Sequence, residues 1–250
     1  MEPINYLIMS DIHEKYDKFN PIKIREKYKD DKIDGIFIAG DITNFGFKIP
    51  RSSHMVLDLI LQERPITDWL QSLKDVFNCR IFFIPGNHDK NMREWKPRIE
   101  GVNNIFNKVI MNFNNTNIVG LSLSPCYDIP SLKDRWDNMV CNQATETKYY
   151  NRFTNLSMFP HDTNILLSHC PPFGYLDECV NEGNPVNIGS KGLLNLINIV
   201  KPKVVICGHV HEYPGKLEVI LHADNQTTTV INVATTYKLL TIDNDKISIK

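Results

Sequence analysis

Short apolar runs that end abruptly in polar residues recur along the chain. They are rich in Ile, Val and Phe, and their length and composition are typical of strands that are buried on both faces of a sheet. The predicted strands are Tyr6–Met9, Ile36–Ala39, Ile81–Ile84, Ile118–Leu123, Ile165–Leu167 and Val204–Cys207.

Two segments between these runs are helical candidates. Met55–Phe77 has apolar residues at helical spacing, and Pro65 is expected to break or kink this helix because proline removes a hydrogen bond from a helix interior. Gly189–Val200 is predicted to form a helix with Ser190 as its N-cap and an end before Pro202.

From Lys216 onward the pattern changes to strands that alternate with turns. The predicted strands here are Leu217–Leu221, Thr228–Val233, Lys238–Ile242 and Ile247–Ile249. Asp224-Asn225 and Asn244-Asp245 lie between them like hairpin turns. The chain thus consists of β/α units followed by a β-rich tail, with Pro125–Thr163 as its least regular part. Since it has no internal repeat or linker, we expect a single domain over residues 1–250.

The composition is that of an ordinary soluble globular protein, with 42% hydrophobic and 23% charged residues in a chain of 250. The net charge of -1 disfavours a protein that holds nucleic acid mainly by charge. No segment approaches the roughly 18 apolar residues of a membrane span, and the apolar N-terminal stretch is a poor signal peptide. Six cysteines without a CxxC pair predict a reducing, cytoplasmic protein with no zinc-finger framework.

A polar cluster follows five of the predicted strands. Ligands of open α/β sheets bind outside the carboxyl ends of the strands, so these clusters are expected to converge on one crevice. The clusters are Asp11-Ile-His13, Gly40-Asp41, Gly86-Asn87-His88-Asp89, Ser-His169 and Gly208-His209-Val-His211.

The residue types in these clusters suit a pair of divalent metal ions. Residues two apart on extended backbone point to the same side, so Asp11 would share a side with His13. His209 would likewise share one with His211. Imidazole and carboxylate ligands suit Mn, Fe, Zn or Ni, and the lack of thiolate ligands argues against a closed structural zinc. Only a group with two oxygens bridges two ions comfortably, and Asp41 is the candidate.

The charge balance of such a site would suit an anionic phosphate. Two divalent cations carry four positive charges and the carboxylates of Asp11 and Asp41 return two, whereas Asn87 and the histidines are neutral. A bridging hydroxide would leave a net charge of about +1, and it would be available at neutral pH because metal coordination lowers the pKa of water to roughly 7.

Each cluster alone also has an ordinary structural explanation. Asp-x-His after a strand is often a helix cap or loop, and Gly-Asp and Gly-Asn are common in turns. Gly-Asn-His-Asp and Gly-His-x-His are more specific. The occurrence of all of them at strand ends, in this order, favours one functional site.

Taken together, D-x-H, G-D, G-N-H-D, H and G-H-x-H between Tyr6 and His211 resemble the calcineurin-like metallophosphoesterase superfamily. The resemblance implies an α/β (α+β) fold, a four-layer αββα sandwich in which helices flank two mixed β-sheets. It implies that Asp41 bridges two metal ions and that His88 contacts the phosphate and assists the leaving group. Asp89 would support the loop. The first ion would take Asp11, His13 and His211, and the second Asn87, His169 and His209.

A narrower resemblance rests on His169-Cys-Pro-Pro-Phe-Gly-Tyr-Leu-Asp177, Gly189-Ser-Lys-Gly-Leu and Gly208-His-Val-His-Glu212. These segments resemble the compact metallophosphoesterase-domain-containing proteins and their microbial relatives, a group associated with hydrolysis of phosphodiesters, including cyclic nucleotides. The protein Ser/Thr phosphatase branch carries G-D-x-x-D-R-G and an Arg before G-N-H-E. Here Asn44-Phe-Gly and Pro85 stand at those places, so the phosphate-clamping arginines are missing and a protein phosphatase is disfavoured.

The expected function is metal-dependent hydrolysis of phosphodiester bonds in small nucleotides, by a hydroxide activated between two divalent ions. Mn is the favoured metal, with Fe, Zn and Ni as alternatives. A phosphomonoesterase or nucleotidase, a nuclease, and a non-catalytic binding scaffold are the alternative functions. The predicted partner is a small phosphoester, with no membrane association and with nucleic acid less favoured.

Side chains near the motifs are candidates for holding the rest of the substrate. Phe173 and Tyr175, or the segment Tyr127–Trp136, could pack against a second substituent. Arg135 or Arg152 could fold over the site. The histidines outside the motifs are expected to be surface or partly buried residues, and they are His54, His161 and His222.

Overall fold

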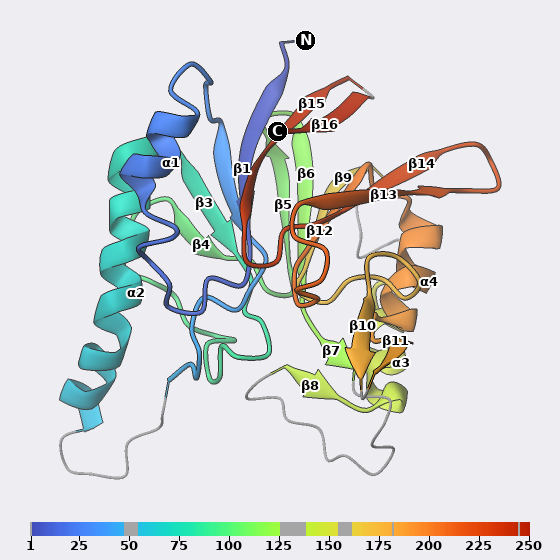
Figure 1. Ribbon diagram of the computed structural model, residues 1–250, viewed down its shortest axis with the longest axis horizontal. Coiled ribbons are helices and arrows are strands. Elements are labelled where there is room, and N and C mark those ends of the chain that lie inside the picture. Colours follow the sequence, from blue (N-terminus) through green and yellow to red (C-terminus); the bar gives the residue numbers. More distant parts are fainter. Residues whose placement is uncertain (1, 48–54, 126–138, 155–161, 182, 245) are drawn as a thin grey trace.

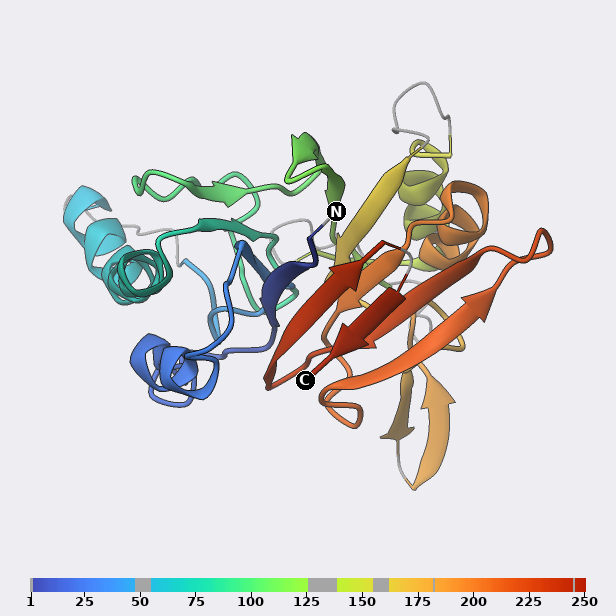
Figure 2. The ribbon, with the colours of Figure 1, turned by 90° about the horizontal axis from the view of Figure 1, so that it is seen from above.

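Two six-stranded β-sheets lie side by side at the centre of the structure, and helices cover the outer face of each (Figure 1). The view from above shows the same four layers (Figure 2). This computed structural model describes residues 2–47, 55–125, 139–154, 162–181, 183–244 and 246–250. The predicted four-layer arrangement of mixed sheets and flanking helices is confirmed.

The first sheet combines strands from both ends of the chain, in the order β16-β15-β1-β2-β3-β4. β1 to β4 are parallel, whereas β15 pairs antiparallel with β1 and with β16. Its outer face is covered by α1 (Pro21–Lys27) and α2 (Met55–Phe77). The strands are β1 Ile4–Met9, β2 Gly35–Ile38, β3 Arg80–Phe83, β4 Val102–Asn104, β15 Tyr237–Asp243 and β16 Lys246–Ile249.

The second sheet has the order β13-β14-β12-β9-β6-β5, with parallel central strands and antiparallel edges. Its outer face is covered by α3 (Gln143–Asn151) and α4 (Lys191–Val200). The strands are β5 Lys108–Phe113, β6 Thr116–Leu121, β9 Thr163–Ser168, β12 Val204–Cys207, β13 Lys216–Leu221 and β14 Thr227–Asn232. Two small ribbons pair β7 (Ser124–Pro125) with β8 (Val140–Cys141) and β10 (Glu178–Asn181) with β11 (Asn184–Asn187).

Alternate residues of the central strands enter different layers, because successive side chains of a strand point to opposite faces. In β1, Leu7 packs toward α1 and α2, whereas Ile8 packs between the sheets. In β12, Ile206 packs between the sheets and Cys207 packs toward α3 and α4. The central strands are therefore buried on both faces, as the apolar runs predicted.

The predicted strands are confirmed, with bounds that shift by a few residues, and the run Val204–Cys207 coincides with β12. The β-rich tail forms two antiparallel hairpins, also as predicted. The hairpins separate in space, because β13 and β14 extend the second sheet whereas β15 and β16 extend the first. The strand pattern of the tail alone did not indicate this division.

Of the break or kink expected at Pro65, the break is wrong, since α2 includes this residue and runs from Met55 to Phe77. Figure 1 shows α2 as one continuous helix. Pro65 is exposed on the helix surface. Ile66, Trp69 and Leu70 are buried in the core beneath it. A proline in a helix interior costs about 3 kcal/mol, whereas burial of one large apolar side chain contributes about 1.5–3 kcal/mol. The buried face of α2 therefore suffices to keep the helix continuous.

The predicted N-cap of α4 is confirmed, because the Ser190 hydroxyl accepts the N–H of Leu193 at 2.9 Å. The helix ends at Val200, and the left-handed backbone of its C-cap, Lys201, turns the chain before Pro202. Glu146 of α3 accepts hydrogen bonds from the Ser190 hydroxyl and the N–H of Gly192, and these bonds tie α3 to the start of α4.

Two helices were not predicted. Asn20 caps α1 and Pro21 follows at its first turn, which is a helix-start signal that the sequence contained. α3 lies within Pro125–Thr163, and its polar sequence buries little beyond Glu146, Tyr149 and Tyr150. No helix among the described residues is long and apolar enough to cross a membrane. Several residues singled out above lie outside the described ranges, namely His54, Tyr127, Arg135, Trp136 and His161.

Candidate metal centre

Every predicted cluster lies in a loop that follows a parallel strand. The loops after β1, β2 and β3 come from the first sheet, and those after β9 and β12 come from the second. They meet where the N–H of His209 donates to the Asp11 carboxylate at 3.0 Å. His169 joins them through Nδ1, which lies 2.8 Å from the Ala39 carbonyl oxygen. The structure therefore brings the predicted clusters of both sheets together.

Four residues of the clusters have a left-handed backbone, a conformation that is costly for residues other than glycine. Asp11 and His13 face one group, as predicted. The reason given for this prediction is wrong, because neither residue lies on extended backbone. Backbone hydrogen bonds of 3.0 Å from Asp11 to Gly40 and from His13 to Asp41 fix these loops side by side. The four residues are Asp11, His13, Asp41 and His209, with φ of 55°, 48°, 51° and 69°.

The first group of converging side chains comprises Asp11, His13 and His211, whose ligand atoms all lie within 4.8 Å of one another. Nε2 of His211 is 2.9 Å from Oδ1 of Asp11, and Nε2 of His13 is 3.7 Å from the same oxygen. Asp11 is buried, whereas His211 is exposed. These are the three residues predicted for the first ion, and their group opens to solvent at His211.

The second group surrounds Nε2 of His169. This atom lies 2.9 Å from Oδ1 of Asn87 and 3.3 Å from Oδ2 of Asp41. The His209 ring packs edge-on against His169, with ring centroids 5.1 Å apart. His169 is fully buried. The structure therefore places His169 next to Asp41, with the other two residues predicted for the second ion, Asn87 and His209, against His169.

Asp41 lies between the two groups. Its Oδ2 is 3.8 Å from Nε2 of His13 and 3.3 Å from Nε2 of His169, one residue from each predicted ligand set. Its Oδ1 accepts the backbone N–H of His88 at 2.7 Å. Ligand atoms of Asp11, Asp41 and His169 also lie within 4.8 Å of one another, so Asp11 and Asp41 link the two groups.

Charge coupling between carboxylates and histidines dominates the cluster. Burial opposes ionisation of Asp11, but its interactions with His13 and His211 outweigh burial and hold its pKa well below the usual range. Burial also opposes ionisation of Asp41, and the charge of His169 outweighs it and lowers the pKa. Burial would lower the pKa of His169, yet Asp41 and Asp11 raise it to about 9. His209 behaves differently, since burial together with the nearby charge of His169 lowers its pKa to about 4.

The donor atoms around His169 fit a cation. Because the Ala39 carbonyl only accepts, Nδ1 of His169 carries a proton and the neutral ring presents a lone pair at Nε2. Three hydrogen-bond acceptors would then converge with no hydrogen-bond donor among them, namely this lone pair, Asp41 Oδ2 and Asn87 Oδ1. A proton on Nε2, or a metal ion in its place, satisfies all three, and the raised pKa of His169 has the same origin. Nitrogen and oxygen donors of this kind suit first-row divalent metals.

The exposed His88 ring is held from two sides. Its Nδ1 lies 3.0 Å from the Asn44 carbonyl oxygen, and the ring packs edge-on against His13 with centroids 4.9 Å apart. Since the carbonyl only accepts, Nδ1 donates and Nε2 is left for a substrate. Asn44 was not predicted to take part, yet its side-chain amide also donates to the Glu14 carboxylate at 3.1 Å. The one signal in the sequence was its place in the loop that begins with Gly40-Asp41.

Asp89 joins the loops after β2 and β3. Its carboxylate accepts the N–H groups of Ile42, Thr43 and Gly86 at 3.1, 2.8 and 2.9 Å. Burial raises its pKa to about 6, and the negative charge of Asp41 adds to the effect. These contacts agree with the loop-supporting role that the resemblance implied.

The glycines of the motifs are required by close packing. A Cβ at Gly40 would lie 2.7 Å from His169 Nδ1, and one at Gly86 would lie 2.2 Å from Asp41 Oδ1. A Cβ at Gly208 would lie 2.2 Å from Asp11 Oδ2. Each glycine therefore leaves the space that a buried site residue occupies.

Other residues singled out in the sequence have partners of their own. The Arg152 guanidinium packs 5.4 Å from the Tyr149 ring centroid. Lys191 Nζ lies 4.8 Å from the Phe173 ring centroid. Tyr175 packs partly into the core beneath α4. His222 is buried, whereas a surface or partly buried position was expected for it.

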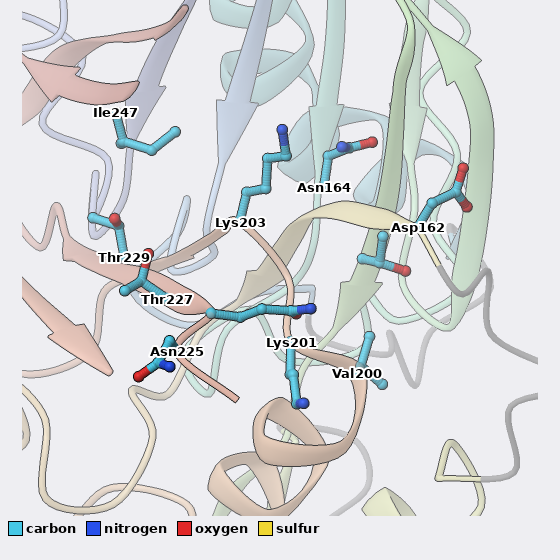
Figure 3. A pocket seen from close by; sticks show the side chains of 11 residues that line it. Asp162, Asn164, Val200, Lys201, Lys203, Asn225, Thr227, Thr229 and Ile247 are labelled. Carbon is cyan, nitrogen blue, oxygen red and sulfur yellow. The ribbon is translucent and has the colours of Figure 1, made fainter. Parts of the chain in front are cut away.

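A hollow of about 600 Å³ lies at the opposite edge of the second sheet (Figure 3). Thr163 and Thr227, which begin β9 and β14, line it together with Lys203, which precedes β12. His169 and the Gly208–His211 loop follow the other ends of β9 and β12. The hollow is therefore separated from the metal centre by the length of a strand, about 20 Å for six residues.

Comparison with known proteins points to one family. A sequence profile described as calcineurin-like phosphoesterase matches residues 4–213, from β1 to the loop after β12. The uncharacterized protein MJ1162 of Methanocaldococcus jannaschii is 28% identical over 213 residues, which are 82% of this chain and 78% of that protein. The UPF0046 protein K07C11.7 of Caenorhabditis elegans is 41% identical over 75 residues, which are 30% of this chain and only 22% of that protein.

The fold is also similar to that of a solved structure. The crystal structure of TT1561 of Thermus thermophilus superposes with a TM-score of 0.62 over 100% of this chain and 99% of that chain. Its sequence identity is 14%, so this likeness shows the fold alone.

Gly208→Ala is expected to displace Asp11, because the added Cβ would lie 2.2 Å from Asp11 Oδ2 and 2.1 Å from Ser10 Oγ. We expect the affinity for Mn²⁺, measured by isothermal titration calorimetry, to fall about tenfold or more, as it does when the support of metal ligands is lost. Gly192→Ala is the matched control, since its Cβ would lie 2.9 Å from Tyr150, on the helix side of the second sheet. It should lower the free energy of unfolding and leave Mn²⁺ affinity unchanged. Equal Mn²⁺ affinities in the two variants would contradict the assignment of Asp11.

Proposed function

The chain belongs to the calcineurin-like phosphoesterase family, and from this premise we propose that it hydrolyses phosphodiester bonds in small nucleotides, cyclic ones included. Family membership supports metal-dependent hydrolysis of phosphoesters. The observation that carries the two-metal chemistry is the position of Asp41 between His13 and His169, at an edge where loops from both sheets meet. The preference for a diester rests on the missing phosphate-clamping arginines. We further propose that residues 1–250 act as one domain in a reducing, cytoplasmic setting, which the buried free thiols of Cys170 and Cys207 support.

Seven residues are assigned to a pair of divalent ions, with Mn²⁺ as the favoured metal. When bound, such ions supply Lewis acidity and lower the pKa of water to roughly 7. Asp41, which has two oxygens, is assigned to both ions. The remaining ligands are Asp11, His13 and His211 for one ion and Asn87, His169 and His209 for the other.

His88 is assigned to the phosphate and the leaving group. Its Nδ1 donates to the Asn44 carbonyl, so a proton on Nε2 is present only in the imidazolium form. As a cation, His88 attracts an anionic phosphate and can pass the Nε2 proton to a leaving alkoxide. The proton on Nδ1 stays hydrogen-bonded to the Asn44 carbonyl oxygen throughout, so the ring keeps its orientation.

Charge recognition favours a diester over a monoester. Phosphomonoesters are dianions near neutral pH, and arginine forks suit their several oxygens. In this chain Pro85 precedes Gly86, and Asn44-Phe45 takes the place of the arginine motif of protein phosphatases. Arg152 packs against Tyr149 of its own helix. Recognition then falls to the two ions and His88. The ion centre with its hydroxide carries about one positive charge before His88 is counted, and a field of this size suits a monoanion.

We therefore expect kcat/KM for bis(4-nitrophenyl) phosphate to exceed kcat/KM for 4-nitrophenyl phosphate at saturating Mn²⁺. Initial rates of nitrophenolate release measure both constants with the same leaving group. A clear preference for the monoester would favour the nucleotidase alternative. No hydrolysis of either substrate, from a protein that purifies without metal and binds none, would favour a binding scaffold.

His88→Ala should separate chemistry from metal binding. Metal content should stay near that of the wild type, because His88 is assigned to substrate and not to an ion. With an alkyl phosphodiester kcat should fall by about 10²–10⁴-fold, the usual contribution of general acid catalysis. With a 4-nitrophenyl ester, whose leaving group needs little protonation, the loss should be smaller. Equal losses on the two substrates would show that His88 is not a proton donor.

A further inference from the structure

Phe45 exposes a large apolar side chain on the loop that carries Asp41. It is 71% exposed, four residues after Asp41. Single exposed apolar residues are common on protein surfaces and need no special explanation. The surroundings of Phe45 distinguish it from such residues.

The loop that carries Phe45 is held on both sides. Before it, Asn44 donates to the Glu14 carboxylate and accepts from His88 through its carbonyl. After it, the N–H of Gly46 donates to the Thr43 hydroxyl at 2.7 Å. The N–H of the next residue, Phe47, donates to the Lys90 carbonyl at 2.7 Å. These hydrogen bonds hold the loop in place and leave the Phe45 side chain in solvent. Through Asn44 the same loop contacts His88, the residue assigned to the leaving group.

A hollow of about 380 Å³ lies beside Phe45, between the loops after β1 and β2 and the middle of α2. Its wall is largely apolar, and the Tyr16 ring in it is packed 5.3 Å from the Trp69 ring, so that side is rigid. Glu14 supplies an acidic edge directly after His13. The described lining residues are Glu14, Tyr16, Thr43, Phe45, Gly46, Gln62, Pro65 and Ile66.

The chemistry of this hollow indicates its occupant. An aromatic side chain on a fixed loop suits a planar ring, because bases stack on such side chains with little regard to sequence. The Glu14 carboxylate accepts two hydrogen bonds from Asn44 and keeps lone pairs for further donors, such as the N–H groups of a base. The same negative charge disfavours a second phosphate at this position. The hollow therefore matches an uncharged nucleobase better than a further anionic group.

We propose that Phe45 and the adjoining hollow bind the nucleobase of the substrate, with Glu14 accepting a hydrogen bond from the base edge. This proposal rests on the phosphodiesterase activity proposed above. In this proposal the base binds at the loop that carries Asp41 and not at Phe173 and Tyr175, which have packing partners of their own. Phe45 is then a specificity residue that acts on binding and takes no part in the chemistry.

The test compares two esters with one leaving group, thymidine 5′-(4-nitrophenyl phosphate) and methyl 4-nitrophenyl phosphate, at saturating Mn²⁺. Phe45→Ala should lower kcat/KM for the thymidine ester by about fivefold or more, the lower end of what stacking contributes per base, and mainly through KM. The methyl ester has no ring to stack, so its kcat/KM should stay unchanged. Phe45→Tyr keeps the ring and should retain the thymidine preference.

Leu221→Ala is the matched control, since Leu221 is 70% exposed on β13. This variant should leave kcat/KM unchanged for both esters. Equal losses on both esters in Phe45→Ala, or no loss on either, would overturn the base site. Isothermal titration calorimetry with a non-hydrolysable thymidine methylphosphonate ester measures its affinity for the wild type and for Phe45→Ala without turnover. Weaker binding by Phe45→Ala supports the base site even where no ester is hydrolysed, in which case only the proposed activity fails, and unchanged binding overturns the site.

Discussion

A buried carboxylate is stable only where donors or positive charge face it, and the centre of this protein is organised around that requirement at Asp41 and Asp11. One oxygen of Asp41 accepts the N–H of His88, and the other lies 3.3 Å from His169. Asp11 accepts the N–H of His209 and lies 2.9 Å from His211. Histidine satisfies these carboxylates as a protonated ring, and it can also share a metal ion with them. The same arrangement therefore serves a proton or a divalent cation.

The rest of the fold serves this requirement. Strands buried on both faces bring loops from two sheets to one edge. Left-handed backbone at Asp11, His13 and Asp41 turns the loops sharply as the strands end, at a cost of about 1–3 kcal/mol per residue. Asp89 and the loop hydrogen bonds offset this cost by tying the loops together. Strain of this kind is tolerated where many contacts fix the surrounding structure.

Much of this arrangement could be predicted from the sequence, because burial and strand periodicity leave a strong local signal. The apolar run before Gly208 coincides with β12, and the glycine itself proved necessary for Asp11 to fit. The positions of Asp41 and His169 at strand ends followed from the same pattern. What could not be predicted depends on contacts distant in sequence. The extended-backbone argument for Asp11 and His13 failed because neighbouring loops, and not the strand, set their φ angles.

Similar limits apply elsewhere in the chain. Pro65 was expected to interrupt α2, but the apolar face of that helix packs on the first sheet and outweighs the local preference of proline. Asn44 and Phe45 carry no motif of their own, and their importance appears only where Asn44 meets His88 and Phe45 borders a hollow. Residues whose role is to orient another residue leave little trace in a single sequence.

The number of Mn²⁺ ions bound per chain tests the central claim most directly. Equilibrium dialysis of the full chain at increasing Mn²⁺, with metal measured by elemental analysis, gives stoichiometry and affinity together. A two-metal centre bridged by one carboxylate predicts about two ions per chain in the wild type and weakened binding of both in Asp41→Asn. Asn87→Ala removes a ligand assigned to one ion, so it should weaken the binding of that ion and leave the binding of the other unchanged. A single ion in the wild type, or loss of only one ion in Asp41→Asn, would contradict the bridging role of Asp41.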